Sequence, residues 1–452
     1  MDKLKIHFIG IGGSSMNGLA LIMKNKGNIV TGSDAVHTAY TDYLEEQGIK
    51  VYIPQCKENI DDYDLVVYTA AISEDNEELM EAKKRGIPCV DRATFLGKIT
   101  NQYGSCVGVA GCHGKTTITS MIALVATKLN PSPTVHVGGS VPFLHGGTHI
   151  GESDLFITEA CEYVNSYLKF HVTTAVINNI DDDHLDFFGD IEHIYESFLT
   201  YANNIPKSGL LIANISDPLV KKITQNVGCN VETYSVYEPA DWQATNIVSH
   251  EDATTTFDIL RNGNFVTSCL LNIPGRYNVQ NALAAIVVCN SLGIPVEQTA
   301  KILEEYKLTK RRFEYYGKMG EINMFHDYAH HPTELDVCIE TAKSLPHEKL
   351  KAIFQCHTYS RAINLLDKYA ESLKVLDEVI VPDIYAAREK NTGEIHAKDI
   401  VNAINEKGGN AKYIATFEEI KEYFADKKDN KDLLLCLGPG DIGEKCKILL
   451  NN

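Results

Sequence analysis

The 452-residue sequence has little positive charge for its size: 42 Lys and Arg residues stand against 60 Asp and Glu residues, so its formal net charge is −18. A surface that binds nucleic acid needs a basic face, so this composition argues against a nucleic-acid partner. An anionic substrate must therefore be bound by local lysine, arginine, backbone amide or metal charges, because the overall field of the protein repels it.

The sequence also lacks the apolar segments of secreted and membrane proteins. Met1–Lys5 leads directly into a short strand-like stretch, and no signal-peptide core follows it. No apolar run is long enough to span a bilayer. The twelve cysteines are scattered and form no Cys-x-x-Cys pair, so we expect no disulfide framework in a chain of this length. These absences predict a cytoplasmic protein without membrane association.

What the sequence does contain is typical of a soluble globular chain, with 44% hydrophobic and 23% charged residues. Short apolar runs alternate with helical patterns, which predicts βαβ units and parallel sheets. The length suggests about three domains, and we place them at 1–100, 101–311 and 312–452. Two local expectations are that Ser73 caps a helix ending at Lys84, and that the stretch from about 207 to 272 forms an antiparallel portion of short strands.

Residues 111–117, Gly-Cys-His-Gly-Lys-Thr-Thr, form the most informative motif. They lie between an apolar run, Cys106–Ala110, and a helix-like run, Ile118–Leu129. Glycines allow backbone amides to close around phosphate oxygens, and the helix N-terminus adds partial positive charge. Lys115 can reach the β- and γ-phosphates of a nucleotide, and Thr116 can hold Mg²⁺. The motif lacks the first glycine of the strict pattern, so it is a shorter phosphate loop; the alternative is an ordinary turn with a surface lysine.

A second glycine-rich turn, Gly10–Gly18, follows the strand-like run Ile6–Ile9 near the start of the chain. It is a loose relative of G-x-G-x-x-G, with Ser15 where the third glycine is expected. Asp34 lies close to the position of the ribose-binding acid in dinucleotide-binding folds. By itself this turn leaves open a dinucleotide oxidoreductase or a tight turn that binds nothing.

Polar side chains follow two further strand-like runs of the second unit. Glu159 and Glu162 come after one run, and residues 178–184, Asn-Asn-Ile-Asp-Asp-Asp-His, come after the next. Ligands of open α/β sheets bind at the carboxyl ends of the strands, so both groups should meet the phosphate loop at one edge. Glu159 and His184 are candidate Mg²⁺ ligands, although Mg²⁺ prefers oxygen. Asp181–Asp183 also fits a solvated turn.

Two other segments carry candidate chemistry. In His326–Glu334, Pro332 suits the first turn of a helix. Its histidines have no further Cys or His at metal-ligand spacing, so we do not expect zinc. Lys310–Arg312 lies at the expected join of the second and third units, where a guanidinium group can clamp a transferring phosphate. The alternative for that segment is a solvated basic linker.

With these residues in view, the sequence resembles the Mur ligases over essentially its full length. The resemblance rests on both glycine-rich loops, on Thr31–Asp34 and Asp183–His184, and on the segments Gly275–Leu283, Arg311–Phe313, Asp327–Thr333, Tyr359–Arg361 and Ile384–Glu389. Sister Mur ligases use a carbamylated lysine soon after the Asp-His pair. This chain has no lysine between His184 and Lys207, which agrees with the branch that adds L-alanine.

The resemblance implies an α/β fold of three domains: a Rossmann-like N-terminal domain, a P-loop ATPase-like central domain and a Rossmann-like C-terminal domain. These domains would bind UDP-N-acetylmuramate, ATP and the amino acid. ATP would phosphorylate the lactyl carboxylate, and the amine of L-alanine would displace phosphate from the acyl phosphate, in peptidoglycan precursor synthesis. The implied cofactors are ATP and Mg²⁺. The oligomeric state stays open between monomer and homodimer.

The resemblance also assigns individual residues. The catalytic group is Lys115, Glu159, His184 and Arg312, and the metal ligands are Thr116, Glu159 and His184. The ATP contacts are Gly111, Cys112, His113, Gly114, Lys115, Thr116, Thr117, Asn278, Asn281, Arg312 and Asp327. The UDP-sugar contacts are Gly12, Gly13, Ser15, Asp34, Glu162, Ser166 and Asn179. The amino-acid pocket is Tyr328, His330, His357 and Arg361, with Arg361 binding the carboxylate.

The chain departs from the family's usual residues at Cys112, Cys161, Tyr163, Tyr277 and Thr358, and in the segment Tyr68–Ile72. Two rival functions share most of these motifs. One is a muropeptide-recycling ligase that joins a preformed tripeptide to the same UDP sugar, and the other is a non-catalytic homologue that only binds nucleotide sugar. The segments Tyr359–Arg361 and Ile384–Glu389 favour the alanine-adding branch, and the intact phosphate loop weighs against the non-catalytic one.

Overall fold

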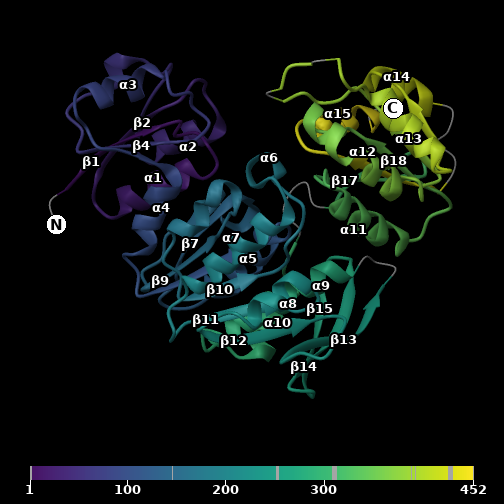
Figure 1. Ribbon diagram of the computed structural model, residues 1–452, viewed down its shortest axis with the longest axis horizontal. Coiled ribbons are helices and arrows are strands. Elements are labelled where there is room, and N and C mark those ends of the chain that lie inside the picture. The colour runs from purple at the N-terminus through teal and green to yellow at the C-terminus, as the bar shows by residue number, and fades with distance from the viewer. Residues whose placement is uncertain are drawn as a thin grey trace. The chain divides into compact units, whose positions relative to one another are not determined.

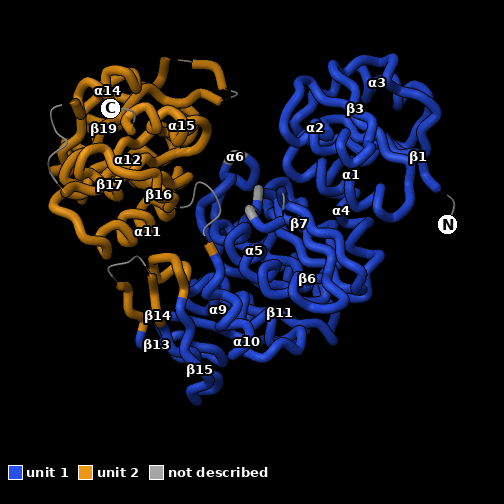
Figure 2. Tube along the Cα trace, turned by 180° about the vertical axis from the view of Figure 1, so that it is seen from behind, with its two compact units in different colours: residues 1–246, 257–270, 279–306 blue, residues 247–256, 271–278, 307–452 orange. Residues whose placement is uncertain are grey.

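The computed structural model describes residues 3–144, 146–250, 254–307, 313–387, 389–391, 393–425 and 431–450. Helices alternate with the strands of three sheets (Figure 1). The chain divides into two compact units: residues 1–246, 257–270 and 279–306 form the first, and residues 247–256, 271–278 and 307–452 form the second (Figure 2). Among the described residues, no helix combines the length and the apolar character needed to cross a membrane.

The N-terminal sheet has five parallel strands in the order β3-β2-β1-β4-β5. Its elements are β1 (Lys5–Ile9), α1 (Met16–Asn25), β2 (Ile29–Ser33), α2 (Ala39–Glu46), β3 (Lys50–Tyr52), β4 (Leu65–Tyr68), α3 (Glu77–Lys84), β5 (Cys89–Asp91) and α4 (Arg92–Thr100). The strand order reverses at β1, so the glycine-rich turn after β1 opens where α/β folds bind ligands.

One helix boundary of this sheet differs from the sequence expectation. Helix α3 begins at Glu77 rather than after Ser73, because Asn76 is its N-cap: the Asn76 side chain accepts hydrogen bonds from the amides of Glu78 and Leu79, both at 3.1 Å. The Ser73 hydroxyl instead donates to Asp75. Both residue types are good N-caps, and only the tertiary structure selects between them.

The central sheet has ten strands in the order β15-β14-β13-β12-β11-β10-β6-β9-β7-β8. Its elements are β6 (Ser105–Ala110), α5 (Lys115–Ala126), β7 (Thr134–Val141), β8 (Gly146–His149), β9 (Leu155–Glu159), the 3₁₀ segment η3 (Tyr163–Lys169), β10 (Thr174–Ile177), α6 (Leu185–Phe188), α7 (Ile191–Asn203), β11 (Leu210–Asn214), α8 (Pro218–Thr224), β12 (Asn230–Ser235), β13 (Trp242–Ser249), β14 (Thr255–Arg261), β15 (Asn264–Leu271), α9 (Arg276–Ser291) and α10 (Val296–Leu303). Strand β6 lies between β9 and β10 and is parallel to both. The loops after these three strands therefore meet at one edge.

The antiparallel expectation for residues 207–272 is wrong for its first half. Strands β11 and β12 pair in parallel, and β12 pairs in parallel with the start of β13. The reason is helix α8, which the sequence reading missed. Asp217 caps this helix and Pro218 occupies its first turn, so the chain crosses over between β11 and β12 instead of turning back as a hairpin.

The C-terminal sheet has six strands in the order β16-β17-β21-β18-β19-β20, and only the β16–β17 pair is antiparallel among the pairs described. Its elements are β16 (Glu314–Met319), β17 (Ile322–Asp327), α11 (Pro332–Lys343), β18 (Leu350–Phe354), α12 (Tyr359–Leu373), β19 (Glu378–Val381), α13 (Ala397–Glu406), β20 (Ala411–Tyr413), α14 (Phe417–Phe424), β21 (Leu433–Leu437) and α15 (Ile442–Cys446). Pro332 opens α11, as its sequence context predicts.

Apolar side chains form separate clusters in the two units. One cluster of the first unit is continuous between the N-terminal and central sheets: Phe8, Leu96 and Ile99 share it with Phe156 and Tyr167. The C-terminal sheet has clusters of its own on residues 313–449. The N-terminal and central sheets are thus held together by a common hydrophobic core.

Candidate functional site

The phosphate loop lies between β6 and α5, as the sequence predicts. Gly111 and Gly114 have φ angles of +140° and +87°, a conformation that glycine adopts without strain. A Cβ atom at Gly114 would lie 2.7 Å from the side chains of both Asn178 and Asn281. Glycine is therefore required at position 114 both by backbone conformation and by close packing.

The loop lysine is held by a buried carboxylate. Lys115 Nζ donates to both oxygens of Glu162, at 3.0 and 2.9 Å, and to the carbonyls of Gly111 and Cys112, at 2.6 and 3.1 Å. Glu162 is only 1% exposed. Burial opposes the positive charge of Lys115, but the Glu162 carboxylate outweighs this effect and raises the pKa of the lysine. The ammonium group therefore stays charged inside the site.

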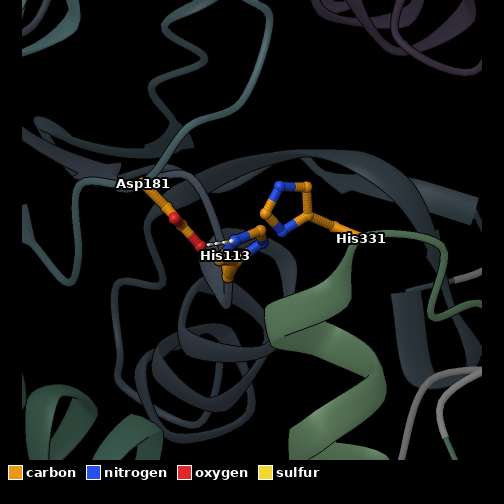
Figure 3. Close-up of side chains that lie close together, drawn as sticks. All are labelled: His113, Asp181 and His331. Carbon is orange, nitrogen blue, oxygen red and sulfur yellow. Dashed lines mark hydrogen bonds and ion pairs between the residues drawn. The ribbon is translucent and has the colours of Figure 1, made fainter. Parts of the chain in front are cut away.

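The loop after β10 is hydrogen-bonded to the phosphate loop. The His113 amide donates to Asn179 Oδ1 at 2.7 Å, and the His113 carbonyl accepts from the Asn178 and Asn179 side chains, both at 3.0 Å. The His113 imidazole Nε2 lies 3.0 Å from Asp181 Oδ2, a contact drawn in Figure 3. The tandem asparagines thus shape the phosphate loop, which gives a structural reason for this pair.

Cys112 occupies the second position of the phosphate loop and is buried. Its Sγ donates to the Asp181 carbonyl at 3.4 Å and accepts from the Asp181 amide at 3.2 Å. Burial, followed by the neighbouring Glu162 charge, raises the pKa of this thiol well above its usual value. The thiol therefore acts as a neutral hydrogen-bonding group that joins two loops.

Two adjacent glycines of β7 face the candidate metal ligands. A Cβ atom at Gly138 would lie 3.2 Å from Glu159 Oε2, and one at Gly139 would lie 3.4 Å from Thr116 Cγ2. Glu159 ends β9, and Thr116 lies in the first turn of α5. The missing side chain of Gly138 leaves room beside a carboxylate, an oxygen donor of the kind that Mg²⁺ prefers, whereas Gly139 faces the Thr116 methyl group. The structure therefore brings two of the three predicted ligands to one place.

The third predicted ligand, His184, lies in a neighbouring cluster. His184 Nε2 is 3.8 Å from Glu162 Oε1 and 3.7 Å from Asp183 Oδ2, and one donor atom from each of the three residues lies within 4.8 Å of the others. His184 has φ +54°, and the Tyr163 ring packs on its imidazole with centroids 4.6 Å apart. Two carboxylates and an imidazole at this spacing can hold a divalent cation.

At the first glycine-rich turn, the Gly12 amide donates to Asp34 Oδ2 at 2.8 Å. Ser15 Oγ is hydrogen-bonded to His136 Nε2 at 2.8 Å and accepts from Arg92 Nη1 at 3.2 Å. Ser15 also caps α1 without a side-chain hydrogen bond to that helix. A serine, a guanidinium group and a helix N-terminus together suit an anion.

In the C-terminal sheet, the predicted amino-acid pocket residues gather near the ends of β17 and β18. The His330 ring lies 5.3 Å from that of Tyr328 and 6.1 Å from that of His357, and Tyr385 stacks on His357 at 5.7 Å. Arg361 lies in the first turn of α12, and its amide donates to the Thr358 hydroxyl. These side chains could line one pocket, while the role of each stays a prediction.

Comparison with known proteins decides the family. Three protein-family models match consecutive parts of the chain. They describe the Mur ligase family catalytic domain at residues 5–104, the Mur ligase middle domain at 109–289, and the Mur ligase glutamate ligase domain at 311–440. This chain belongs to the Mur ligase family. As a Mur ligase, it is an ATP-dependent enzyme of three-domain α/β architecture.

Particular relatives of this Mur ligase match over its whole length. The UDP-N-acetylmuramate–L-alanine ligase of Caldanaerobacter subterraneus is 44% identical over 98% of this chain and 97% of the relative. The structure of UDP-N-acetylmuramate-alanine ligase MurC from Thermotoga maritima is 28% identical with a TM-score of 0.81, covering 99% and 98% of the two chains. A murein peptide ligase from Psychrobacter arcticus shares the fold, at 23% identity and a TM-score of 0.68 over 99% and 98%.

Several predicted site residues of the Mur ligase make other contacts in the structure. The Asp327 carboxylate, predicted to contact ATP, accepts from the amides of Phe313 and Ala329, both at 2.7 Å. The Asn278 side chain donates to the Pro274 carbonyl at 2.7 Å. The remaining contacts join Asn281 to Asn178, and Ser166 to the Tyr163 carbonyl. Arg312 lies outside the described residues, as do Lys310, Arg311 and Arg388.

Four residues of the site were missed at the sequence level: Arg92, His136, Gly138 and Gly139. The Gly138-Gly139 pair carried a signal, since two glycines within a strand often mark a close approach of a ligand or of another chain segment. No sequence signal marks Arg92 or His136, because their contacts with Ser15 form only when the chain folds.

Proposed function

We propose that this Mur ligase joins L-alanine to the lactyl carboxylate of UDP-N-acetylmuramate, in peptidoglycan precursor synthesis. The relative from Caldanaerobacter that bears this activity in its name matches over almost the full length of both chains. The structural observation that carries the proposal is the convergence of Lys115, Thr116, Glu159 and His184 at the carboxyl ends of β6, β9 and β10. These are the groups that a phosphoryl transfer from ATP requires.

The reaction needs these charges for a simple reason. A carboxylate is a poor acyl donor until one of its oxygens becomes part of a good leaving group. Attack of the lactyl carboxylate on the terminal phosphorus of ATP forms an acyl phosphate and releases ADP. The neutral amine of L-alanine then adds to the acyl carbon, and the tetrahedral intermediate expels phosphate as the amide forms. The first step brings a carboxylate against a triphosphate, so the site must neutralise several negative charges.

The positive groups for this step come from the phosphate loop. Lys115 binds phosphate oxygens, and the amides of residues 111–116 add donors at the N-terminus of α5. Thr116, Glu159 and His184 would hold Mg²⁺, which supplies charge neutralisation and orientation of the phosphates when bound. The room left by Gly138 beside the Glu159 carboxylate supports the part of this assignment that concerns Glu159. Arg312 is proposed as a further phosphate contact on the resemblance alone.

The other substrates are assigned to the outer sheets. The turn at Gly12 and Ser15, with Asp34, suits the UDP moiety, because Ser15 and Arg92 lie at the N-terminus of α1. In the C-terminal sheet, Arg361 is proposed to bind the carboxylate of L-alanine beside the rings of His330 and His357. We further propose domain boundaries at 1–100, 101–311 and 312–452, and a cytoplasmic site of action.

The test is phosphate release from ATP and Mg²⁺ by the purified full-length chain with UDP-N-acetylmuramate, with and without L-alanine. Release that requires both substrates supports the proposal. If L-alanine gave no release and the tripeptide L-alanyl-γ-D-glutamyl-diaminopimelate did, the chain would be a recycling ligase. Binding of ATP without release in the presence of any acceptor would leave only a non-catalytic role.

A further inference from the structure

A buried tyrosine of the central sheet, which has no part in the reaction proposed above, is hydrogen-bonded to the loop after β10. Tyr234 lies in β12 and is fully buried. It pairs with Asn214 of β11, one position beyond the pair that Ala213 forms with Ile177 of β10. The Tyr234 hydroxyl donates to Asn178 Oδ1 at 2.7 Å. The tyrosine therefore reaches across β11 to the residue that follows β10.

The Asn178 side chain links the phosphate loop to helix α9. Its Nδ2 donates to the His113 carbonyl at 3.0 Å and to Asn281 Oδ1 at 3.3 Å. Its Oδ1 accepts from the Tyr234 hydroxyl and, at 3.4 Å, from Gln280 Nε2. The two donors and the two acceptor sites of this buried amide are thus all used, and the bond from Tyr234 is the shorter of the two at Oδ1.

The tyrosine is the donor that this arrangement requires. The His113 carbonyl can only accept, so the Nδ2 end of Asn178 must face it and the Oδ1 end must face Tyr234. Burial raises the pKa of the Tyr234 hydroxyl well above its usual value, so the hydroxyl keeps the proton that it donates. If the hydroxyl is removed, Oδ1 keeps only the long bond from Gln280, and a buried acceptor without a good donor is costly. The amide is then stabilised by shifting toward another donor, which weakens its bond to His113.

A shift of this side chain acts on the phosphate loop because the two are in close contact. A Cβ atom at Gly114 would lie 2.7 Å from Asn178 Nδ2. The backbone of Asn178 is held separately: its amide donates to the Ala110 carbonyl at 3.0 Å, and its carbonyl accepts from Asn214 Nδ2 at 2.8 Å. Loss of the Tyr234 hydroxyl therefore acts on the side chain of Asn178, and through it on the loop, while the end of β10 stays in place.

We propose that Tyr234 is a positioning residue of the nucleotide site: through Asn178 it holds the phosphate loop in the conformation that binds phosphate. Without the hydroxyl, only a fraction of the folded molecules has the loop in this conformation, and nucleotide affinity falls by that fraction. The inference rests on the proposed assignment of residues 111–117 to the phosphates of ATP, and it adds a residue that acts on this loop indirectly.

The first test measures ADP binding with Mg²⁺ by calorimetry for the wild type and for Tyr234→Phe, which removes only the hydroxyl. ADP should bind about fivefold more weakly to the variant, the effect of one hydrogen bond. The matched control is Tyr201→Phe in α7 of the same unit: Tyr201 is also fully buried, and its hydroxyl has no hydrogen-bond partner among the described residues. This control should leave ADP affinity unchanged. Unchanged affinity in Tyr234→Phe, or equal weakening in both variants, would overturn the proposal.

The second test asks whether Tyr234 acts through Asn178. In the Asn178→Ala background, Tyr234→Phe should change the dissociation constant of ADP less than about twofold, because the hydroxyl no longer has its acceptor. A residue that only packs in the core would instead lower the affinity equally in both backgrounds, and that result would refute the proposed route. Circular dichroism checks that each variant is folded, and the first test decides by itself if Asn178→Ala is not.

A kinetic measurement separates this role from a general loss of stability. Tyr234→Phe should raise KM for ATP about fivefold and leave kcat and KM for L-alanine unchanged. A lower kcat with an unchanged KM for ATP would contradict the proposal. The ADP measurements involve neither UDP-N-acetylmuramate nor L-alanine. A wild type that binds ADP without forming the amide would refute the proposed ligase reaction and leave the role of Tyr234 testable, so the two failures are distinguishable.

Discussion

His136 should make the stability of the first unit depend on pH in a way that one substitution removes. The side chain is 2% exposed in β7, with Nε2 2.8 Å from Ser15 Oγ and Nδ1 3.1 Å from Thr148 Oγ1. Burial, and then the charge of Arg92, lower the pKa of His136 from 6.5 to about 3. The folded protein therefore keeps His136 neutral at pH values where the unfolded chain protonates it.

The sign and size of the effect follow from linkage. Above about pH 6.5 both states hold a neutral His136, so its full contribution to stability is present. As the pH falls below 6.5, His136 becomes protonated in the unfolded state, whereas in the folded state it stays neutral until about pH 3. Each pH unit in this window lowers the free energy of unfolding by up to about 1.4 kcal/mol, so the loss between pH 7 and pH 5 is about 2 kcal/mol.

The assay is urea unfolding of the wild type and of His136→Gln at pH 7 and pH 5, followed by circular dichroism. The variant should be less stable at pH 7, because it loses hydrogen bonds to Ser15 and Thr148, but the gap should shrink by about 2 kcal/mol at pH 5. Substitution of the exposed His37 is the control and should leave the pH dependence of the wild type intact. Parallel profiles for wild type and His136→Gln would refute the reasoning.

Three further predictions concern the phosphate loop and the join between the sheets. Lys115→Ala should lower the rate of phosphate release at least 100-fold while circular dichroism shows a retained fold; near-normal turnover would rule out the phosphate-loop assignment. Gly114→Ala should destabilise the protein by about 1–3 kcal/mol and weaken ATP binding, because φ is +87° and the new methyl group would lie 2.7 Å from two asparagine side chains; thermal unfolding and calorimetry measure both effects. Asp91→Asn should cost about 1 kcal/mol in urea unfolding at pH 7, since it weakens the α4 cap and the pairing with Lys169. Burial opposes the negative charge of Asp91, but hydrogen bonds from Thr94 and Lys169 outweigh it and lower its pKa from 3.8 to about 2. The stability due to Asp91 is thus present above pH 4 and lost as the pH falls toward 2, and an equal acid sensitivity in Asp91→Asn would contradict this.

The parts of the site that depend on local signals could be predicted from the sequence. The phosphate loop was recognisable because its glycines and Lys115 are adjacent, and Glu159 and His184 because each follows the end of a buried strand. The three α/β sheets followed from the alternation of strand and helix patterns. Helix α8 was missed because it is only seven residues long and its capping residue is of a type that turns also use.

The partners of these residues could not be predicted. Ser15 and His136 are 121 residues apart in the chain, and nothing in either local sequence marks the other. The same holds for Glu162, whose place after a strand indicates a site but not that its carboxylate holds Lys115. Such pairings depend on how the sheets pack, which a single sequence does not report.

The close contact between α4 and η3 bears on how this chain can be divided experimentally. A Cβ atom at Gly97 would lie 2.2 Å from the Lys169 carbonyl oxygen, so the two backbones touch at a point where only glycine fits. Leu96 and Ile99 beside it belong to the core shared by the two sheets. Expressing residues 101–307 alone would uncover this apolar surface and promote aggregation. A chimera that takes its N-terminal domain from a relative should therefore take both α4 and η3 from that relative. These two segments pack directly against each other, so their side chains and the glycine at position 97 must match.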